Sequence, residues 1–255
     1  MVTTFSEANY EEAVLELFRN MGYQYAYGPN VERDFQSPLY DEVLLEYIYR
    51  LNPALPAEAI NEAMYKLKNY ENGELVQKVR YNEQGEEKNA IVYLVDYENL
   101  DNNSFIVANQ WTFVENSNRR PDIILFLNGL PIVLIELKSP SREETDASEG
   151  YAQIRNYMQE IPSMFIYNCI CVISDHLTSR AGTITSGEDR FMEWKTKDGN
   201  YENTKQAQFD TFFDGMFEKS RLLDIIKNFI CFSDEGLQHL KILAGYHQYF
   251  AVKKI

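Results

Sequence analysis

The spacing of apolar residues in the first seventy positions predicts three helices. Over residues 6–21 apolar side chains recur every three or four positions, which predicts an amphipathic helix with Ser6 as its N-cap and Gly22 at its end. Two further helices are predicted over residues 38–50 and 56–70, since each segment opens with a proline. The apolar stripe of the first helix would consist of Tyr10, Val14, Leu17, Phe18 and Met21.

From residue 90 the apolar residues alternate with polar ones or form short continuous runs, which is typical of β-strands. Polar segments at residues 72–73 and 82–88 are predicted to be turns or loops. Strands are expected over residues 90–97, 104–115, 122–127, 132–138, 167–174, 181–185 and 190–195. Helices are expected over residues 148–160, 204–217, 220–230 and 235–251. The order predicts an α/β fold in which helices flank a mixed central β-sheet, with a helical C-terminal extension.

Two of the most apolar strands carry charged residues at their ends. The segment reads RRPDIILFLNGLPIVLIELKSP, with Asp122 at the start of one strand and Glu136 and Lys138 at the end of the next. Burying such charges is costly unless they pair or bind a metal ion. A divalent cation held by Asp122 and Glu136, with Lys138 beside it, would remove that cost and form a site for hydrolysing a phosphodiester.

The register of this hairpin tests the idea. If Asn128 and Gly129 formed a strict two-residue turn, Asp122 would pair with Ile135, and the two acids would lie on opposite faces. A shared metal requires Asp122 to lie opposite Glu136. We therefore predict a glycine bulge in a loop of residues 128–130, or an equivalent one-residue shift along either strand.

The Glu-x-Lys pattern alone is weak, because it also occurs at residues 86–88 and 193–195. Only the pair at Glu136 and Lys138 ends a continuous apolar strand and follows a Pro-Asp pair across a hairpin. The competing interpretation is that Asp122 caps a strand start and that Glu136 and Lys138 form a solvated strand end. Spacing alone leaves the two interpretations balanced.

Other polar residues are candidates for the same site. Gln153 and Tyr157 lie four residues apart on one face of the helix expected over residues 148–160, where they could contact a phosphate or orient the lysine. Glu11, on the first helix, could supply a further carboxylate. Each of these residues could equally belong to an ordinary helix surface. The basic residues near the candidate site are Arg119, Arg120, Lys138, Arg142 and Arg155.

Composition narrows the classes of protein. The 255 residues carry a formal net charge of −15, which argues against a protein that binds nucleic acid through its own basic surface. Three cysteines without Cys-x-x-Cys spacing make a structural zinc site improbable, and they fit a reducing cytoplasm. We expect Cys169 and Cys171 to be small buried residues of an apolar strand. There is no signal segment and no apolar run of membrane-spanning length, so no membrane association is expected.

The chain resembles the N-terminal nuclease region of the restriction (R, or HsdR) subunit of type I restriction-modification enzymes. The resemblance covers nearly the whole chain in family order. It rests on the segments SEANYEEAVLELFRNMGY, RRPDIILFLNGLPIVLIELKSP, QIRNY, SDHLTSRAG, FMEW and KILAGYHQYFAVKKI. One departure is His176, where many relatives have glycine.

The resemblance implies a PD-(D/E)xK (restriction-endonuclease-like) fold and a set of roles. Asp122 and Glu136 would bind Mg²⁺ or Mn²⁺, together with the backbone carbonyl of Leu137, and Lys138 would be the catalytic lysine. Glu11 matches a first-helix glutamate that often joins the site. The resemblance implies that the remaining candidates support DNA binding or the active site: Gln153, Tyr157, Arg120 and Arg155.

The resemblance also implies a larger enzyme. Residues 1–232 would form the endonuclease domain, with a core of about 90–175, and residues 233–255 a linker and the first helix of a superfamily 2 translocase. Gln248 would contact the adenine of ATP in the full-length subunit only. The partners would be double-stranded DNA and the methylation (M) and specificity (S) subunits, and the fragment alone is expected to be monomeric. The alternatives are a catalytically silent docking or DNA-holding module, and a stand-alone Mrr-like nuclease.

Overall fold

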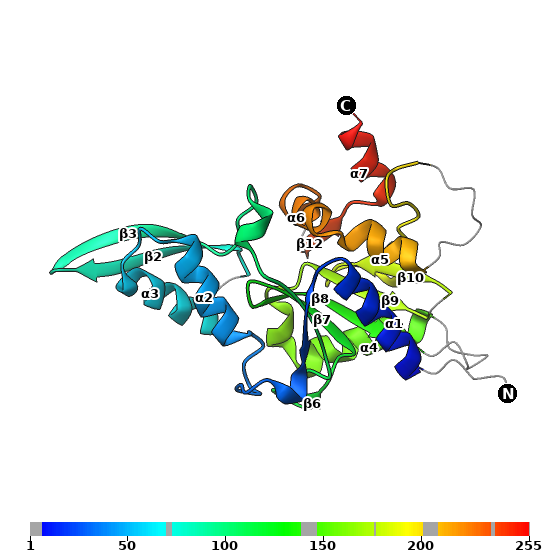
Figure 1. The fold of residues 1–255 in the computed structure, drawn as a ribbon, viewed down its shortest axis with the longest axis horizontal. Coiled ribbons are helices and arrows are strands. Elements are labelled where there is room, and N and C mark those ends of the chain that lie inside the picture. Colours follow the sequence, from blue (N-terminus) through cyan, green and yellow to red (C-terminus); the bar gives the residue numbers. More distant parts are fainter. Residues whose placement is uncertain are drawn as a thin grey trace.

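A computed structural model describes residues 7–69, 73–138, 147–175, 177–200, 209–235 and 238–254 (Figure 1). Its helices are α1 (Glu7–Asn20), α2 (Asp41–Leu51), α3 (Ala57–Lys68), α4 (Ala147–Glu160), α5 (Phe209–Phe217), α6 (Lys219–Asn228) and α7 (Tyr246–Lys253). Its strands are β1 (Gln24–Tyr27), β2 (Val76–Glu83), β3 (Glu86–Tyr93), β4 (Phe105–Asn109), β5 (Phe113–Val114), β6 (Asn118–Arg119), β7 (Ile123–Leu127), β8 (Leu130–Leu137), β9 (Ile170–Ser174), β10 (Ser179–Gly182), β11 (Ile230–Glu235) and β12 (Gln238–Leu243).

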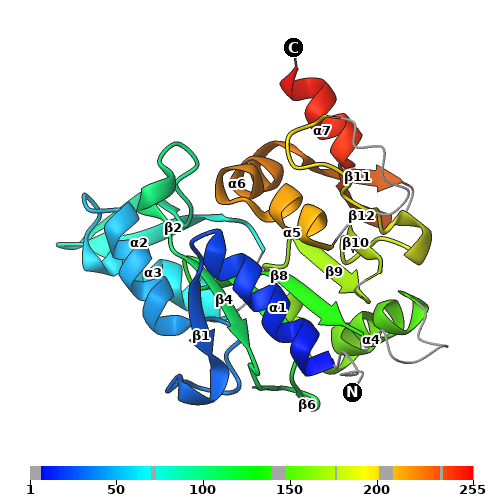
Figure 2. The same ribbon diagram turned by 45° about the vertical axis from the view of Figure 1, so that its right-hand side comes forward.

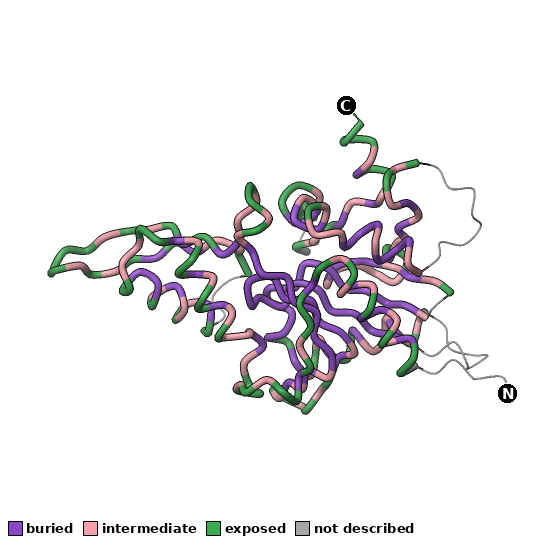
Figure 3. The backbone as a smooth tube through the Cα atoms, viewed as in Figure 1, coloured by how far each residue is buried: buried purple, intermediate pink, exposed green. Residues whose placement is uncertain are grey.

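The centre of the molecule is a six-stranded sheet in the order β1-β4-β7-β8-β9-β10. The β1–β4 and β8–β9 pairs are parallel, and the other three pairs are antiparallel. The sheet is therefore mixed, and the expected α/β fold with a mixed central sheet is confirmed. Figure 3 shows that this sheet is the buried centre of the molecule.

Two apolar cores cover the two faces of the sheet. The first core joins α1, α5 and α6 to one face, and α1 lies across this face in Figure 2. The second core joins α4 to the other face, where Ile154 and Tyr157 pack with Leu134 of β8. Burial of both faces explains why β7 and β8 are continuous apolar runs instead of alternating ones. Cys171 is buried as expected, and burial raises the pKa of its thiol to about 12.

The β7–β8 hairpin contains the register shift that the two acids require. Asn128 and Gly129 form a two-residue turn with φ angles of 50° and 83°, and Leu127 pairs with Leu130. Farther along the hairpin Ile123 pairs with Ile135, because the register shifts by one residue next to Phe126. The predicted shift is confirmed. It lies along the strand, as a bulge, and not in the turn.

A separate lobe extends away from the sheet (Figure 1). It consists of α2, α3 and the antiparallel β2–β3 hairpin. The loop predicted over residues 82–88 is largely wrong, because Asn82 and Glu83 end β2 and Glu86 begins β3. Polar residues alternate along a two-stranded ribbon that exposes one face to water, so the sequence gives no clear strand signal there.

The C-terminal segment differs most from the sequence prediction. The single helix expected over residues 235–251 is wrong, since β11 and β12 form a hairpin and α7 starts only at Tyr246. The helix predicted over residues 220–230 ends at Asn228. The strand predicted over residues 190–195 is reduced to one bridge between Ala181 and Met192. Short apolar runs fit either type of element until their packing partners are known.

Two further strands differ from the prediction, and a few predicted features fall outside the described residues. The strand β1 was not predicted, because its four residues are mostly exposed and only its pairing with β4 defines it. The strand predicted over residues 104–115 is interrupted at Gln110, whose φ is 53°. Ser6, His176 and residues 204–208 lie outside the described residues. Among the described residues, no helix is both long and apolar enough to cross a membrane.

The boundary expected between residues 232 and 233 falls within β11. Tyr249 of α7 packs against Phe229, with ring centroids 4.7 Å apart, and against Trp194 at 5.6 Å. The division into an endonuclease domain and a linker stays a prediction.

Replacing Gly129 by alanine should destabilise the protein far more than the same change at Gly85. Both glycines have positive φ, 83° and 90°, which costs an alanine about 1–2 kcal/mol. A Cβ at Gly129 would also lie 2.6 Å from the backbone of Tyr40 and Leu44, whereas the space around Gly85 is open. We expect Gly129→Ala to lower the free energy of unfolding by more than about 3 kcal/mol, measured in urea. Equal losses for the two variants would contradict the packing of α2 on this turn.

Candidate active site

The bulge places the two predicted acids on one face of the sheet. Ile123 and Ile135 are paired, so continuing the register by one residue sets Asp122 opposite Glu136. Leu134, two residues before Glu136, belongs to the core beneath α4, and so does Ile124, two residues after Asp122. Because side chains alternate along a strand, both carboxylates lie on the α4 side.

Asp122 is fixed against the backbone of β8. Its Oδ2 accepts a hydrogen bond from the Leu137 N–H at 2.7 Å. The side chain is half-buried, which leaves part of the carboxylate accessible to solvent. This hydrogen bond holds a carboxylate oxygen beside the strand that carries Glu136.

Glu136 is buried, with 4% of its surface exposed. Lys138 Nζ lies 2.7 Å from Glu136 Oε1, and the Lys138 N–H donates to Ser174 O at 2.8 Å. The interpretation of Glu136 and Lys138 as a solvated strand end is therefore wrong for Glu136. A buried carboxylate is expensive unless it is compensated, and here an ammonium group compensates it.

Helix α4 brings Tyr157 and Gln153 to the same site. Burial chiefly, and then the charge of Glu136, raise the pKa of the Tyr157 phenol well above its usual value, and Asp122 adds to the effect. Gln153 lies close enough to Tyr157 to oppose this rise in the pKa of the phenol. Two predicted residues thus lie beside Glu136, namely Lys138 and Tyr157, and Gln153 lies beside Tyr157.

The close approach of α4 to the sheet depends on Gly150. A Cβ at this position would lie 3.2 Å from Ile173 Cγ2 and 3.9 Å from Lys138 Cγ. The first turns of α4 therefore lie directly over β9 and beside the lysine. The sequence prediction of this helix gave no reason for a glycine there.

Glu11 hydrogen-bonds with residues at the end of β4 and not with Asp122 or Glu136. Its Oε1 accepts hydrogen bonds from Asn109 Nδ2 at 2.5 Å and from Gln110 Nε2 at 3.4 Å. Among the described residues no three acidic, histidine or cysteine side chains form a group fit to hold a metal ion. The structure thus does not bring Glu11 together with Asp122 and Glu136 as a three-carboxylate cluster, and its role at a metal stays a prediction.

The other predicted residues lie outside β7 and β8. Arg120 is exposed, one residue beyond β6. Arg155 is exposed on α4 and donates to Ile184 O at 3.0 Å. Gln248 lies in the first turn of α7, where its Oε1 accepts a hydrogen bond from the Gly245 N–H at 2.8 Å. None of these contacts tests the roles that the resemblance implies.

A chain of buried hydroxyl groups behind the site was not foreseen. Tyr10 Oη lies 2.6 Å from Ser174 Oγ, which lies 2.5 Å from Ser179 Oγ. Ser174 is also the residue whose carbonyl accepts from the Lys138 N–H. Tyr10 was predicted only as part of an apolar stripe, because the sequence does not show which strand the helix faces.

The family model for the N terminus of the type I restriction enzyme R protein matches residues 4–190. The chain belongs to this family. It is 30% identical, over 98% of its length, to the endonuclease subunit of the type I restriction enzyme HindI from Haemophilus influenzae, of which it covers 26%. It is 29% identical, over 96% of its length, to the putative type I restriction enzyme MjaIXP endonuclease subunit from Methanocaldococcus jannaschii, covering 27%. The chain thus spans about a quarter of these relatives.

Breaking the ion pair between Glu136 and Lys138 should show that the two side chains contribute to stability in a strongly coupled way. Lys138→Met leaves the carboxylate in its buried place without this cation, whereas Glu136→Gln with Lys138→Met removes both charges. We expect a coupling energy of about 1–3 kcal/mol in a double-mutant cycle of urea unfolding with EDTA present. The exposed pair of Lys227 and Glu98, at 2.7 Å, is the control and should show less than about 1 kcal/mol. Additive effects at Lys138 and Glu136 would show that the pair is not formed.

Proposed function

We propose that this chain carries the DNA-cleaving site of a type I restriction enzyme, built as a PD-(D/E)xK site. The observation that carries the proposal is the convergence of Asp122 and Glu136 on one face of two adjacent strands, with Lys138 paired to Glu136. Membership of the family supports it, since the relatives named above are endonuclease subunits. The reaction would be hydrolysis of a phosphodiester of double-stranded DNA.

The donor atoms at this site suit Mg²⁺ or Mn²⁺. Asp122 and Glu136 supply carboxylate oxygens, which such hard cations prefer. The N–H and C=O groups of one residue in an extended strand point to the same neighbour, and the Leu137 N–H points to Asp122. The Leu137 carbonyl is therefore expected on the same side, as a third ligand. When bound, the cation would neutralise phosphate charge and lower the pKa of a water molecule.

The neighbouring side chains have separate tasks in this scheme. Lys138 would orient the attacking water or stabilise the negative charge that develops on the phosphate. Tyr157 keeps its proton, because burial and the charge of Glu136 disfavour the phenolate, so its hydroxyl serves as a hydrogen-bond donor at neutral pH. Gln153, beside that hydroxyl, would contact the phosphate or orient it. Arg120 and Arg155, both exposed, would contact the DNA backbone farther out.

The rest of the enzyme would supply what this chain lacks. Because the chain spans about a quarter of its relatives, we propose that ATP-driven translocation and binding to M and S subunits belong to the complete enzyme in the cytoplasm. With a net charge of −15 the chain would grip DNA weakly by itself. Gln248 would turn from its contact with Gly245 to the adenine of ATP only in the complete subunit.

Alanine at Asp122, Glu136 or Lys138 should abolish DNA cutting by the complete assembly and leave ATP hydrolysis unchanged. Each substitution removes a group that acts on the phosphate, and none lies on the proposed motor segment. Cutting is measured by gel electrophoresis and ATP hydrolysis by phosphate release. The controls are Glu86→Ala and Lys88→Ala, which change the same residue pattern on the remote β2–β3 hairpin. Retained cutting by any of the three test variants would overturn the assignment.

Substitutions at the site should separate metal binding from catalysis, because Asp122 would bind the ion and Lys138 would not. We expect calorimetric titration of the chain with Mn²⁺ to show one site that Asp122→Asn removes, because the neutral amide is a poor ligand for this cation. Lys138→Ala should retain the ion, since an ammonium group is no ligand. A wild-type chain without such a site would instead favour a silent docking module.

A further inference from the structure

The row of residues that contains the two acids continues to the edge of the sheet. Glu136 of β8 pairs with Ile173 of β9, and Ile173 pairs with Arg180 of β10. Paired residues of neighbouring strands project to the same face, and Ile173 lies in the core beneath α4. Arg180 therefore lies on the α4 side, in the row of Asp122 and Glu136.

The alternation along β10 agrees with this placement. Ala181 belongs to the opposite core, and a Cβ on Gly182 would lie 2.7 Å from the ring of Phe191, which belongs to the core beneath α4. Two strand spacings, about 10 Å, separate the backbones at Glu136 and Arg180. That span equals roughly three nucleotides of rise along one DNA strand.

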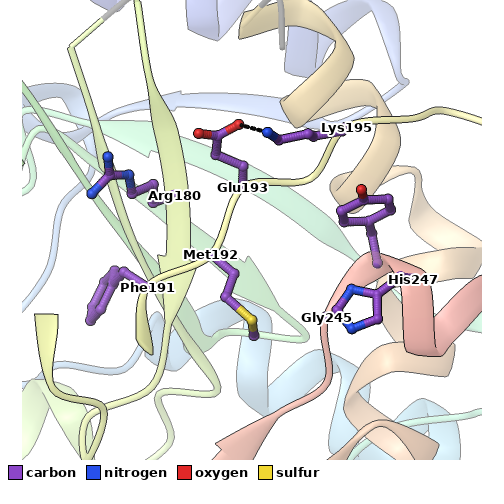
Figure 4. Close-up of a pocket in the computed structure, with 8 residues that line it drawn as sticks. Arg180, Phe191, Met192, Glu193, Lys195, Gly245 and His247 are labelled. Carbon is purple, nitrogen blue, oxygen red and sulfur yellow. Dashed lines mark ion pairs between the residues drawn. The ribbon is translucent and has the colours of Figure 1, made fainter. Parts of the chain in front are cut away.

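Arg180 borders a hollow of ≈ 340 Å³, whose other charged or titratable lining groups include Glu193, Lys195 and His247. Figure 4 shows Lys195 paired with Glu193 across the hollow from Arg180, and His247 at the start of α7. Glu193 lies 2.9 Å from Lys195 and offsets its charge. Arg180 forms no ion pair with any carboxylate of the described residues. A half-exposed arginine without such a partner is unexpected in a chain of net charge −15, where acids outnumber basic residues by 39 to 24.

The chemistry of the hollow fits one phosphate group of a nucleic-acid strand. The guanidinium group presents several N–H donors in a fixed plane that matches phosphate oxygens. The lysine and histidine add polar hydrogen-bonding groups at the rim. Ile173 is the residue of this row between Glu136 and Arg180, and the first turns of α4 cover it, since a Cβ at Gly150 would lie 3.2 Å from Ile173 Cγ2.

We propose that Arg180 binds a backbone phosphate of the same DNA strand that is cut, a few nucleotides from the scissile bond. This inference rests on the proposed function, because the position of the phosphate at Arg180 is counted from the scissile phosphate at Asp122 and Glu136. Arg180 would hold the strand at the β10 edge of the sheet, beyond the part that α4 covers. It would supply a positive contact that the overall charge of the chain does not.

The test is the salt dependence of DNA binding by the 255-residue chain, with Ca²⁺ in place of Mg²⁺ to prevent cutting. Binding of a labelled duplex is followed by fluorescence anisotropy at several salt concentrations. Arg180→Ala should weaken binding roughly tenfold and reduce the slope of log K against log salt by about 0.9. Arg180→Lys should keep the slope and lose only part of the affinity.

Arg190→Ala is the matched control, because its side chain is 80% exposed, lies beside Asp189 and does not line the hollow. It should leave the slope unchanged. If Arg180→Ala does not fold, as judged by circular dichroism, Arg180→Gln replaces it and should give the same loss of slope. In the complete assembly, Arg180→Ala should lower the salt concentration at which cutting is lost without changing ATP hydrolysis.

An unchanged slope for Arg180→Ala would overturn the inference, and so would a variant that loses ATP binding instead of DNA binding. The proposed function fails on a different result, namely cutting by Asp122→Ala. If Asp122→Ala no longer cuts DNA and Arg180→Ala keeps the wild-type salt slope, the proposed nuclease site is supported and the phosphate contact of Arg180 is refuted.

Discussion

The cost of burying carboxylates in an apolar sheet governs the arrangement of this protein. Glu136 lies almost out of solvent, and its charge is compensated by Lys138 on the same strand, while the phenol of Tyr157 on α4 lies nearby. Removing Asp122 to the opposite face would separate the two acids and leave a second charge to be compensated alone. The one-residue bulge next to Phe126 prevents this, so a small irregularity in one hairpin makes a common site possible.

The two layers of helices have different tasks around that site. On one face α1 buries apolar residues and reaches the end of β9 through the Tyr10 hydroxyl. On the other face α4 places Tyr157 and Gln153 over the acids, and Gly150 lets the helix approach the sheet closely. The face that carries the proposed site is thus the one on which α4 packs.

The net charge of the chain, −15, limits how it could bind DNA. A chain with 15 more acidic than basic charges is poorly suited to hold DNA by long-range attraction, so positive contacts have to be local. Arg180 would offer such a contact in the row of the acids.

The sequence by itself determined the local features: the first helix and its apolar stripe, the hairpin at Asn128 and Gly129, and the need for a shift that brings Asp122 opposite Glu136. These depend on spacing within about twenty residues, where periodicity and turn chemistry are sufficient. Only the tertiary structure decided the edge strand β1, the β11–β12 hairpin and the partners of Glu11, because each depends on a distant segment that supplies hydrogen bonds or packing. Short segments with little periodicity take the form that their neighbours stabilise, and those neighbours are known only after folding.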